Sequence, residues 1–154
     1  MRVKVQILNK KNMGKVSVDI EIVNFVDEEM AARGLIDPEK IRKVILKDVL
    51  VDTGASTVCL PLSVIKALGL SPLGEVMTET AAGTHNRKIF RGASFKIGDR
   101  TATFDCLELP EGSKPLLGVF PMEFLGIEVD LQNEKLVFLE MNENHSYLTI
   151  YNLT

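Results

Sequence analysis

Residues 49–56 carry the sequence Val49-Leu50-Val51-Asp52-Thr53-Gly54-Ala55-Ser56. Three apolar residues lead directly into an acidic one, and burying an isolated carboxylate is costly because the group loses its hydration. The next residues offset that cost: Gly54 permits a tight turn, and the Thr53 and Ser56 hydroxyls and the turn amides can hydrogen-bond a carboxylate. The stretch therefore predicts a buried strand that ends in a turn at Asp52. A simple Asx-type turn without function is the plain alternative.

Two further segments accompany this motif along the chain. Pro115-Leu116-Leu117-Gly118 precedes a short helical stretch at residues 121–125 and an apolar strand at residues 127–131. Between the two motifs lies a hairpin whose tip reads Thr80-Ala81-Ala82-Gly83-Thr84. Over residues 16–139, this arrangement resembles the retropepsin-like (retroviral-type, clan AA) aspartic proteases, whose active-site motif is matched by Leu50-Val51-Asp52-Thr53-Gly54-Ala55.

The resemblance implies a mainly β, closed barrel-like retropepsin (acid protease) fold with one or two short helices. It also implies a role for each matched segment. Asp52 is the expected catalytic residue, and the loop that supports it comprises Thr53, Gly54, Ala55 and Ser56. The expected buttress behind the loop is Leu116, Leu117 and Gly118, and the expected flap over the substrate is Ala81, Ala82, Gly83 and Thr84.

Hydrolysis by this route needs two carboxylates that share one water molecule, one accepting its proton while the other polarises the peptide carbonyl. No other aspartate in the sequence is followed by Thr-Gly or Ser-Gly. A two-fold axis between two copies of Asp52 would supply the second carboxylate. We therefore expect each chain to be a half-site of a homodimeric aspartic endopeptidase that cleaves extended peptides or unfolded proteins without a cofactor or metal. The competing hypothesis is a catalytically weak or silent dimerisation or peptide-binding module, favoured by a flap tip with Gly83 as its one glycine.

Hydrophobic periodicity predicts the remaining elements. Alternating residues indicate a hairpin of strands 3–7 and 16–22 and further strands at 75–80, 88–97, 101–109, 135–139 and 146–153, with hairpin turns at 82–83 and 98–99. The apolar run at 44–51 predicts a central strand buried on both faces. A helix is expected from Pro61 to Leu68, ending at Gly69. Residues 27–43 interrupt the strands as an insertion, with helical composition over 27–33 and a helical start at Asp37-Pro38.

The composition fits a single domain over residues 1–154. The net charge of −3 predicts neither nucleic-acid nor membrane binding. No apolar run approaches the roughly 20 residues of a membrane span, and the first seven residues alternate, so a cytoplasmic location is expected. Cys59 and Cys106 fit buried residues of a reducing compartment. A zinc site made from these two with His85 and His145 lacks metal-knuckle spacing, and His85 is expected to be a solvated loop residue.

Overall fold

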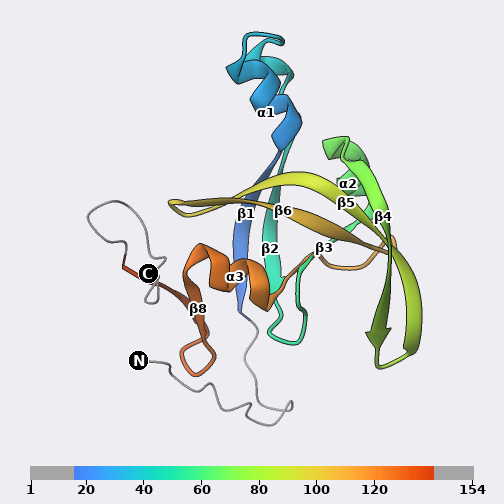
Figure 1. The fold of residues 1–154 in the computed structure, drawn as a ribbon. Helices are drawn as coiled ribbons and strands as arrows, with labels where there is room; N and C mark the ends of the chain where they lie inside the picture. The colour runs from blue at the N-terminus through green and yellow to red at the C-terminus, as the bar shows by residue number, and fades with distance from the viewer. Residues whose placement is uncertain (1–15, 141–154) are drawn as a thin grey trace, which may run out of the picture.

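The computed structural model describes residues 16–140 (Figure 1). In chain order its elements are β1 (Ser17–Asn24), α1 (Phe25–Ala32), the 3-10 helix η1 (Pro38–Lys40), β2 (Lys43–Val51), β3 (Val58–Pro61), α2 (Leu62–Leu68), β4 (Ser71–Thr80), β5 (Gly83–Ile97), β6 (Arg100–Leu109), β7 (Leu116–Leu117), α3 (Val119–Leu125), β8 (Ile127–Asp130) and β9 (Lys135–Phe138). The prediction of a mainly β fold with short helices is confirmed. The strands expected at residues 3–7 and 146–153 lie outside the described residues.

The main sheet closes on itself into a ring of strands. Its order is β1-β2-β7-β3-β6-β5-β4, and β1 also pairs with β5, so that β4 extends the sheet beyond the ring. The pairs β2–β7 and β3–β6 are parallel, while the other pairs are antiparallel. Strands β8 and β9 form a separate two-stranded antiparallel sheet.

The core fills the inside of the ring. One row of paired residues crosses the sheet and is buried throughout, with exposed fractions of 8% or less: Val51, Leu117, Val58, Cys106 and Phe90. Helices α2 and α3 add apolar side chains to this core, among them Ile65, Leu68, Met122 and Leu125. Removing these side chains from water is the main favourable contribution to folding. The expectation that Cys59 and Cys106 are buried is confirmed.

Strand β2 is not the central strand, buried on both faces, that its apolar sequence predicts. Among its residues only Val49 and Val51 are buried, and Ile45 is 61% exposed. Strand β7 reaches only Leu50 and Val51 of β2, so the earlier residues of β2 form an edge that pairs with β1 alone. The apolar run therefore reflects one half-buried edge segment followed by a short buried segment.

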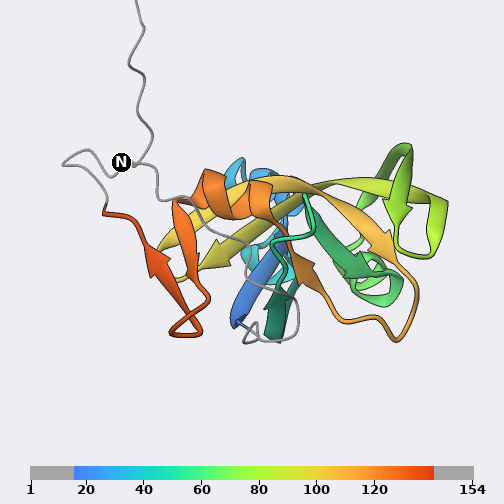
Figure 2. The same cartoon turned by 90° about the horizontal axis from the view of Figure 1, so that it is seen from below.

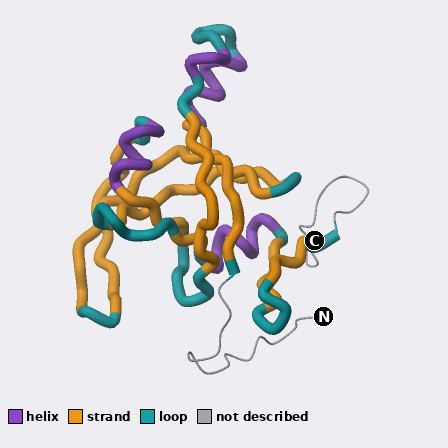
Figure 3. The backbone as a smooth tube through the Cα atoms, turned by 180° about the vertical axis from the view of Figure 1, so that it is seen from behind, coloured by secondary structure: helices purple, strands orange, loops and turns teal. Residues whose placement is uncertain are grey.

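The insertion between β1 and β2 forms an arm that carries α1 and η1. In Figures 1 and 3 this arm stands at the end of the molecule opposite the β4–β5 hairpin tip. Helix α1 begins at Phe25, two residues before the predicted start, because the Asn24 side chain caps it by accepting a hydrogen bond from the Asp27 amide at 3.0 Å. The second predicted helical turn is the 3-10 helix η1, and Asp37 makes no side-chain capping bond there.

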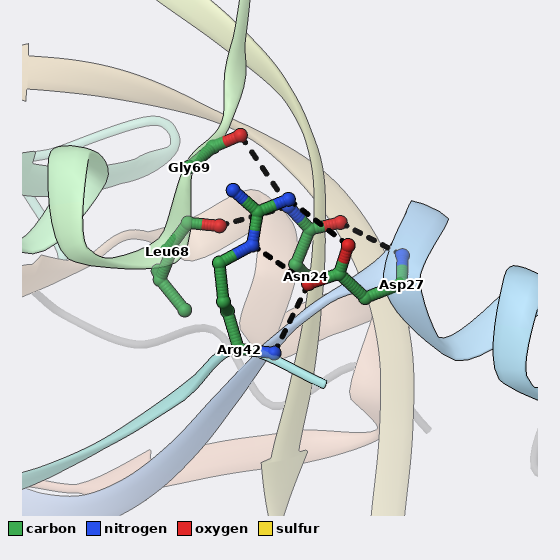
Figure 4. A network of polar contacts seen from close by, with 5 residues as sticks. All are labelled: Asn24, Asp27, Arg42, Leu68 and Gly69. Carbon is green, nitrogen blue, oxygen red and sulfur yellow. Dashed lines mark hydrogen bonds and ion pairs between the residues drawn. The ribbon is translucent and has the colours of Figure 1, made fainter. Parts of the chain in front are cut away.

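A polar network fastens the arm to the body (Figure 4). Asn24 Nδ2 donates to the Leu68 carbonyl at 2.8 Å, which joins β1 to the last turn of α2. The Arg42 guanidinium binds the Asp27 carboxylate through two hydrogen bonds, Nε to Oδ2 at 2.8 Å and Nη2 to Oδ1 at 2.9 Å. The Arg42 amide also donates to Asp27 Oδ2 at 3.0 Å. Hydrogen bonding from the Arg42 side chain is the main reason that the pKa of Asp27 is lowered.

The remaining predicted helix, hairpin strands and turn at 98–99 agree with the structure within a few residues. Helix α2 follows Pro61 and ends at Gly69, as expected. The flap turn, however, comprises Ala81 and Ala82, one residue earlier than predicted, with Gly83 as the first residue of β5. None of the helices within residues 16–140 is long and apolar enough to cross a membrane.

Candidate active site

The loop that follows β2 holds Asp52 at a fixed place in the sheet. The Asp52 amide donates to the Leu117 carbonyl at 3.0 Å, which extends the parallel pairing of β2 with β7 by one residue. The Gly54 amide donates to Asp52 Oδ1 at 2.8 Å, and the Ala55 amide donates to the Asp52 carbonyl at 3.1 Å. These bonds make a tight turn around a half-buried carboxylate whose orientation is set by a backbone amide.

The rest of this loop faces solvent in the single chain. Thr53, Gly54 and Ser56 are exposed, and Ala55 is half-buried. Asp52 is therefore at the edge of the described body, with the side of the loop formed by Thr53 and Gly54 open. The structure thus places all the predicted loop residues in one turn that is accessible from outside.

The predicted buttress lies directly behind the loop. Leu116 and Leu117 form β7 between β2 and β3, and Gly118 is buried against the loop backbone. A Cβ atom added at Gly118 would lie 2.5 Å from the Thr57 carbonyl oxygen and 2.7 Å from that of Ala55. Such distances are too short for any side chain, so the close packing of the two segments requires glycine.

Helix α3 adds two hydrogen bonds to the same contact. The Val119 amide donates to the Ala55 carbonyl at 2.9 Å, and the Phe120 amide donates to the Ser56 carbonyl at 3.1 Å. Amides at the start of a helix have no partner within the helix, and here the loop carbonyls supply one. The family resemblance implied this contact between the two segments but not these bonds, because backbone groups leave no residue-type signal.

The pairing register shows which face of the sheet carries Asp52. Next to the buried row through the ring runs a second row of paired residues, Leu50, Leu116, Cys59, Leu107 and Ile89. Side chains of neighbouring rows point to opposite faces, so this second row lies outside the core. Its members are half-buried except for Cys59, which is 6% exposed. Asp52 lies two residues after Leu50 and thus continues the same face, which we call the Asp52 face.

Electrostatics agree with this placement. The pKa of Cys59 is raised by burial and, to a smaller extent, by the negative charge of Asp52. The influence of Asp52 on Cys59 is expected for two groups on one face of neighbouring strands. Cys106 belongs to the buried row instead, so the two thiols point to opposite faces of the sheet. Burial is also the main cause of the raised pKa of Cys106.

The zinc site considered from the sequence does not assemble in the described part of the chain. Cys59 and Cys106 lie on opposite faces, His85 lies in the β4–β5 hairpin, and His145 is outside the described residues. Within residues 16–140, no cluster of three or more histidine, cysteine or acidic side chains is placed to hold a metal ion.

The predicted flap is the β4–β5 hairpin, which stands to one side of the Asp52 loop in Figures 1 and 2. Its tip residues, Ala81, Ala82, Gly83 and Thr84, are all exposed. Gly83 has φ of 114°, a conformation that residues with a Cβ rarely adopt. The structure therefore brings the buttress against the Asp52 loop but leaves the flap tip apart from it.

Two threonine hydroxyls stabilise the hairpin and were not expected from the sequence. Thr80 Oγ1 donates to the Gly83 carbonyl at 3.1 Å and accepts from the Ala82 amide at 3.2 Å. Thr78 Oγ1 donates to the His85 carbonyl at 3.0 Å. Thr78 and Thr80 alternate along β4, and this spacing was the sequence signal that could have predicted hydroxyl groups on one face of the hairpin. His85 is an exposed strand residue and not the loop residue expected.

Comparisons with known proteins agree with this geometry. The chain is similar in structure to the EIAV protease in complex with the inhibitor HBY-793, with a TM-score of 0.50, 16% sequence identity, 82% of this chain covered and 100% of that chain covered. This similarity shows the retroviral protease fold. No curated protein matches the sequence. A family model described as aspartyl protease matches residues 40–124, which is more than half of the chain. The protein belongs to this aspartyl protease family.

Proposed function

We propose that the protein is an aspartic endopeptidase that works as a homodimer, with one Asp52 from each subunit at the catalytic centre. The observation that carries this proposal is the Asp52 turn, in which a backbone amide orients a carboxylate at the accessible end of β2. The sequence holds one such motif, so a single chain contributes one carboxylate. A two-fold axis beside the exposed Thr53 and Gly54 brings the second one close, because an isologous contact places a residue beside its own equivalent.

The chemistry then follows from two like charges that share one proton. Two adjacent carboxylates cannot both ionise cheaply, so one is protonated and the other is charged. The charged carboxylate takes a proton from water while the water oxygen attacks the peptide carbonyl carbon. At the same time the protonated carboxyl donates its proton to the carbonyl oxygen. The carboxyl that took the water proton then gives it to the amide nitrogen, and the other carboxylate takes a proton from a hydroxyl of the tetrahedral diol. The C–N bond breaks, the new carboxyl and amine ends leave, and the pair again holds one proton. The Gly54 amide holds the Asp52 carboxylate in one orientation throughout.

An exposed apolar side chain beside the loop supports a contact between subunits there. Phe120 is joined to the loop through its amide bond to the Ser56 carbonyl, and its side chain is 70% exposed. Large aromatic side chains are enriched in protein interfaces, where burial removes them from water. Thr53 would hydrogen-bond across the axis, and the β4–β5 hairpin would cover an extended peptide.

The test is cleavage of an unfolded protein or a fluorogenic peptide between pH 4 and 7 by the wild type and by Asp52→Asn. We expect the substitution to reduce kcat by at least about a hundredfold, because the amide can neither accept the water proton nor share a proton with its partner. A statine-type inhibitor should block the wild type. Equal cleavage by both proteins would contradict the proposal.

The second candidate is a peptide-binding or dimerisation module without catalysis. The observation that favours it is the hairpin tip, where Thr80 closes the turn with two hydrogen bonds and Gly83 is the only glycine. A hairpin held in this way bends less readily over a substrate than a glycine-rich one. A dimer that binds peptides but cleaves none between pH 4 and 7 would favour this candidate.

A further inference from the structure

The two faces of the β4–β5 hairpin carry different side chains. Residues that pair across the two strands share a face. On one face Val76 pairs with Arg87, and Thr78 pairs with His85. On the other face Glu75 pairs with Lys88, and Met77 pairs with Asn86. Only one of these two faces continues the Asp52 face and can therefore contact a substrate bound there.

The pairing register of β5 with β6 and β4 identifies this face as the one that carries His85 and Arg87. Ile89 belongs to the row of the Asp52 face through its pairing with Leu107. Arg87 and His85 lie two and four residues before Ile89 in the same strand, and alternation places them on the face of Ile89. Burial agrees, because Thr78, Arg87 and Ile89 are half-buried. On the opposite face Met77 is 71% exposed.

The side chain of the half-buried Arg87 has no carboxylate partner in the part of the chain that the structure describes. Its guanidinium makes no hydrogen bond or ion pair with any residue between 16 and 140. Its neighbours on the same face are Val76 across the hairpin and Ile89 and His85 along the strand, while Glu75 and Glu79 of β4 belong to the opposite face. In contrast, Arg33, Arg42 and Arg100 each bind an acidic side chain within this chain.

We propose that Arg87 is a specificity-determining residue that binds the carboxylate of an aspartate or glutamate side chain in the substrate. The inference rests on the proposed function and names the class of peptide that the same site prefers. Guanidinium groups bind carboxylates through two parallel hydrogen bonds. The apolar Val76 and Ile89 share this face with Arg87, and a peptide that covers them would exclude water from such an ion pair and so strengthen it.

An extended peptide that lies against the hairpin presents alternate side chains to this face. The two-fold axis of the proposed dimer places a second Arg87 at the other end of the cleft. The preferred substrates therefore carry acidic side chains on both sides of the bond that is cut. His85 and Thr78 add polar groups to the same face.

Pairs of fluorogenic peptides that differ only by glutamate or glutamine at each position flanking the scissile bond test this proposal. At about pH 6 the substrate carboxylates are ionised. We expect the wild type to prefer glutamate by about tenfold in kcat/KM at one or more positions. Arg87→Gln should reduce this ratio to about one, and Arg87→Glu should favour a lysine peptide instead.

Lys88→Gln is the matched control, because it removes one positive charge from the neighbouring residue on the opposite face. It should keep the preference for glutamate. The melting temperature of each variant shows whether the fold is intact. No preference in the wild type, or an equal loss of preference in the Arg87 and Lys88 variants, would overturn the role of Arg87.

Binding measurements separate this proposal from the proposed function. Fluorescence anisotropy with the same labelled peptides reports the preference even where no cleavage occurs. If the wild type cuts none of the peptides but binds glutamate peptides more tightly through Arg87, the proposed peptidase activity is contradicted and the proposed role of Arg87 stands. If the wild type cuts glutamate and glutamine peptides equally well, the proposed role of Arg87 is contradicted and the proposed peptidase activity stands.

Discussion

Single residues set how closely the two motifs of the candidate site approach each other. The Asp52 turn and the segment after β7 meet at Gly118, where the missing side chain lets the Ala55 and Thr57 backbone come near. The Val119 and Phe120 amides then reach the loop carbonyls. The position of Asp52 therefore depends on a glycine that lies 66 residues later in the chain (118 − 52).

The substitution Gly118→Ala tests this dependence. Its Cβ would meet backbone atoms of Thr57 at 2.5 and 2.6 Å, and backbone cannot move aside as a flexible side chain does. We expect the free energy of unfolding to fall by about 2 to 3 kcal/mol, measured by urea denaturation. Gly74→Ala is the control, since a Cβ there meets nothing within 4 Å, and it should change stability by less than about 0.5 kcal/mol. Similar stabilities of the two variants would contradict the packing argument.

At the scale of elements, the arm of α1 and η1 is joined to the body by polar contacts at its base. Asn24 connects β1 with the end of α2, and Asp27 connects the first turn of α1 with Arg42 just before β2. The Asp27 side chain is 9% exposed, so its charge depends on Arg42 for compensation. These contacts fix the base of the arm to the body, although its outer residues, such as Leu35, are exposed.

The substitution Asp27→Asn removes the charge of this network. We expect a loss of about 2 to 3 kcal/mol of stability at pH 7, because Arg42 keeps its charge but loses its carboxylate. Glu29→Gln in the same helix removes a surface ion pair with Arg33 at 3.6 Å and should cost less than about 0.5 kcal/mol. Thermal unfolding of both variants and of the wild type measures these losses. A loss for Asp27→Asn no larger than that for Glu29→Gln would show that the Asp27–Arg42 contact adds no more stability than a surface ion pair.

The same contact makes stability depend on pH. The pKa of Asp27 is lowered in the folded chain, mainly by hydrogen bonding from Arg42, so the folded state binds fewer protons than the unfolded state in acid. The stabilisation is complete above the ordinary aspartate pKa of about 4 and is lost as the pH falls through the lower, folded value. Unfolding measured from pH 7 down to pH 2 should show a smaller acid loss for Asp27→Asn than for the wild type. Parallel curves would contradict this account.

At the scale of the whole molecule, the ring of strands presents one acidic turn at its end and leaves it open. Within the described chain the Asp52 loop and the flap tip do not meet, and Thr53 and Gly54 are exposed. In the proposed function, activity is therefore a property of the dimer and not of the single chain. For the proposed dimer, specific activity should fall on dilution, because dissociation removes the second carboxylate.

Mixing subunits tests the assembly directly. After exchange with a tenfold excess of Asp52→Asn subunits, about a tenth of the wild-type subunits remain paired with each other. We expect the peptidase activity of a fixed amount of wild type to fall to about that fraction. The same excess of an unrelated protein is the control and should leave activity unchanged. Activity that survives the excess, or that is independent of dilution, would mean that one chain suffices.

Much of the fold follows from local patterns in the sequence. Alternation predicted β4, β5, β6 and β9, and Pro61 with Gly69 marked the ends of α2, because these signals act over a few neighbouring residues. The prediction that residues 44–51 form a central strand buried on both faces was wrong, because hydrophobicity indicates burial but not how far a neighbouring strand extends. The threonine bonds of the hairpin and the amide bonds from α3 depend on distances that residue types do not encode.

The sequence by itself determined β1, β4, β5, β6, β8 and β9 and the turn that holds Asp52, since periodicity and turn chemistry are local properties. It did not indicate β3 or β7, which are only four and two residues long. The tertiary structure decided which side chains share the face of Asp52, because that depends on the register through β2, β7, β3, β6 and β5. A shift of one residue in any of these pairings would send Arg87 to the other face. The alignment of Arg87 with Asp52 is therefore a consequence of strand pairing and not of sequence separation.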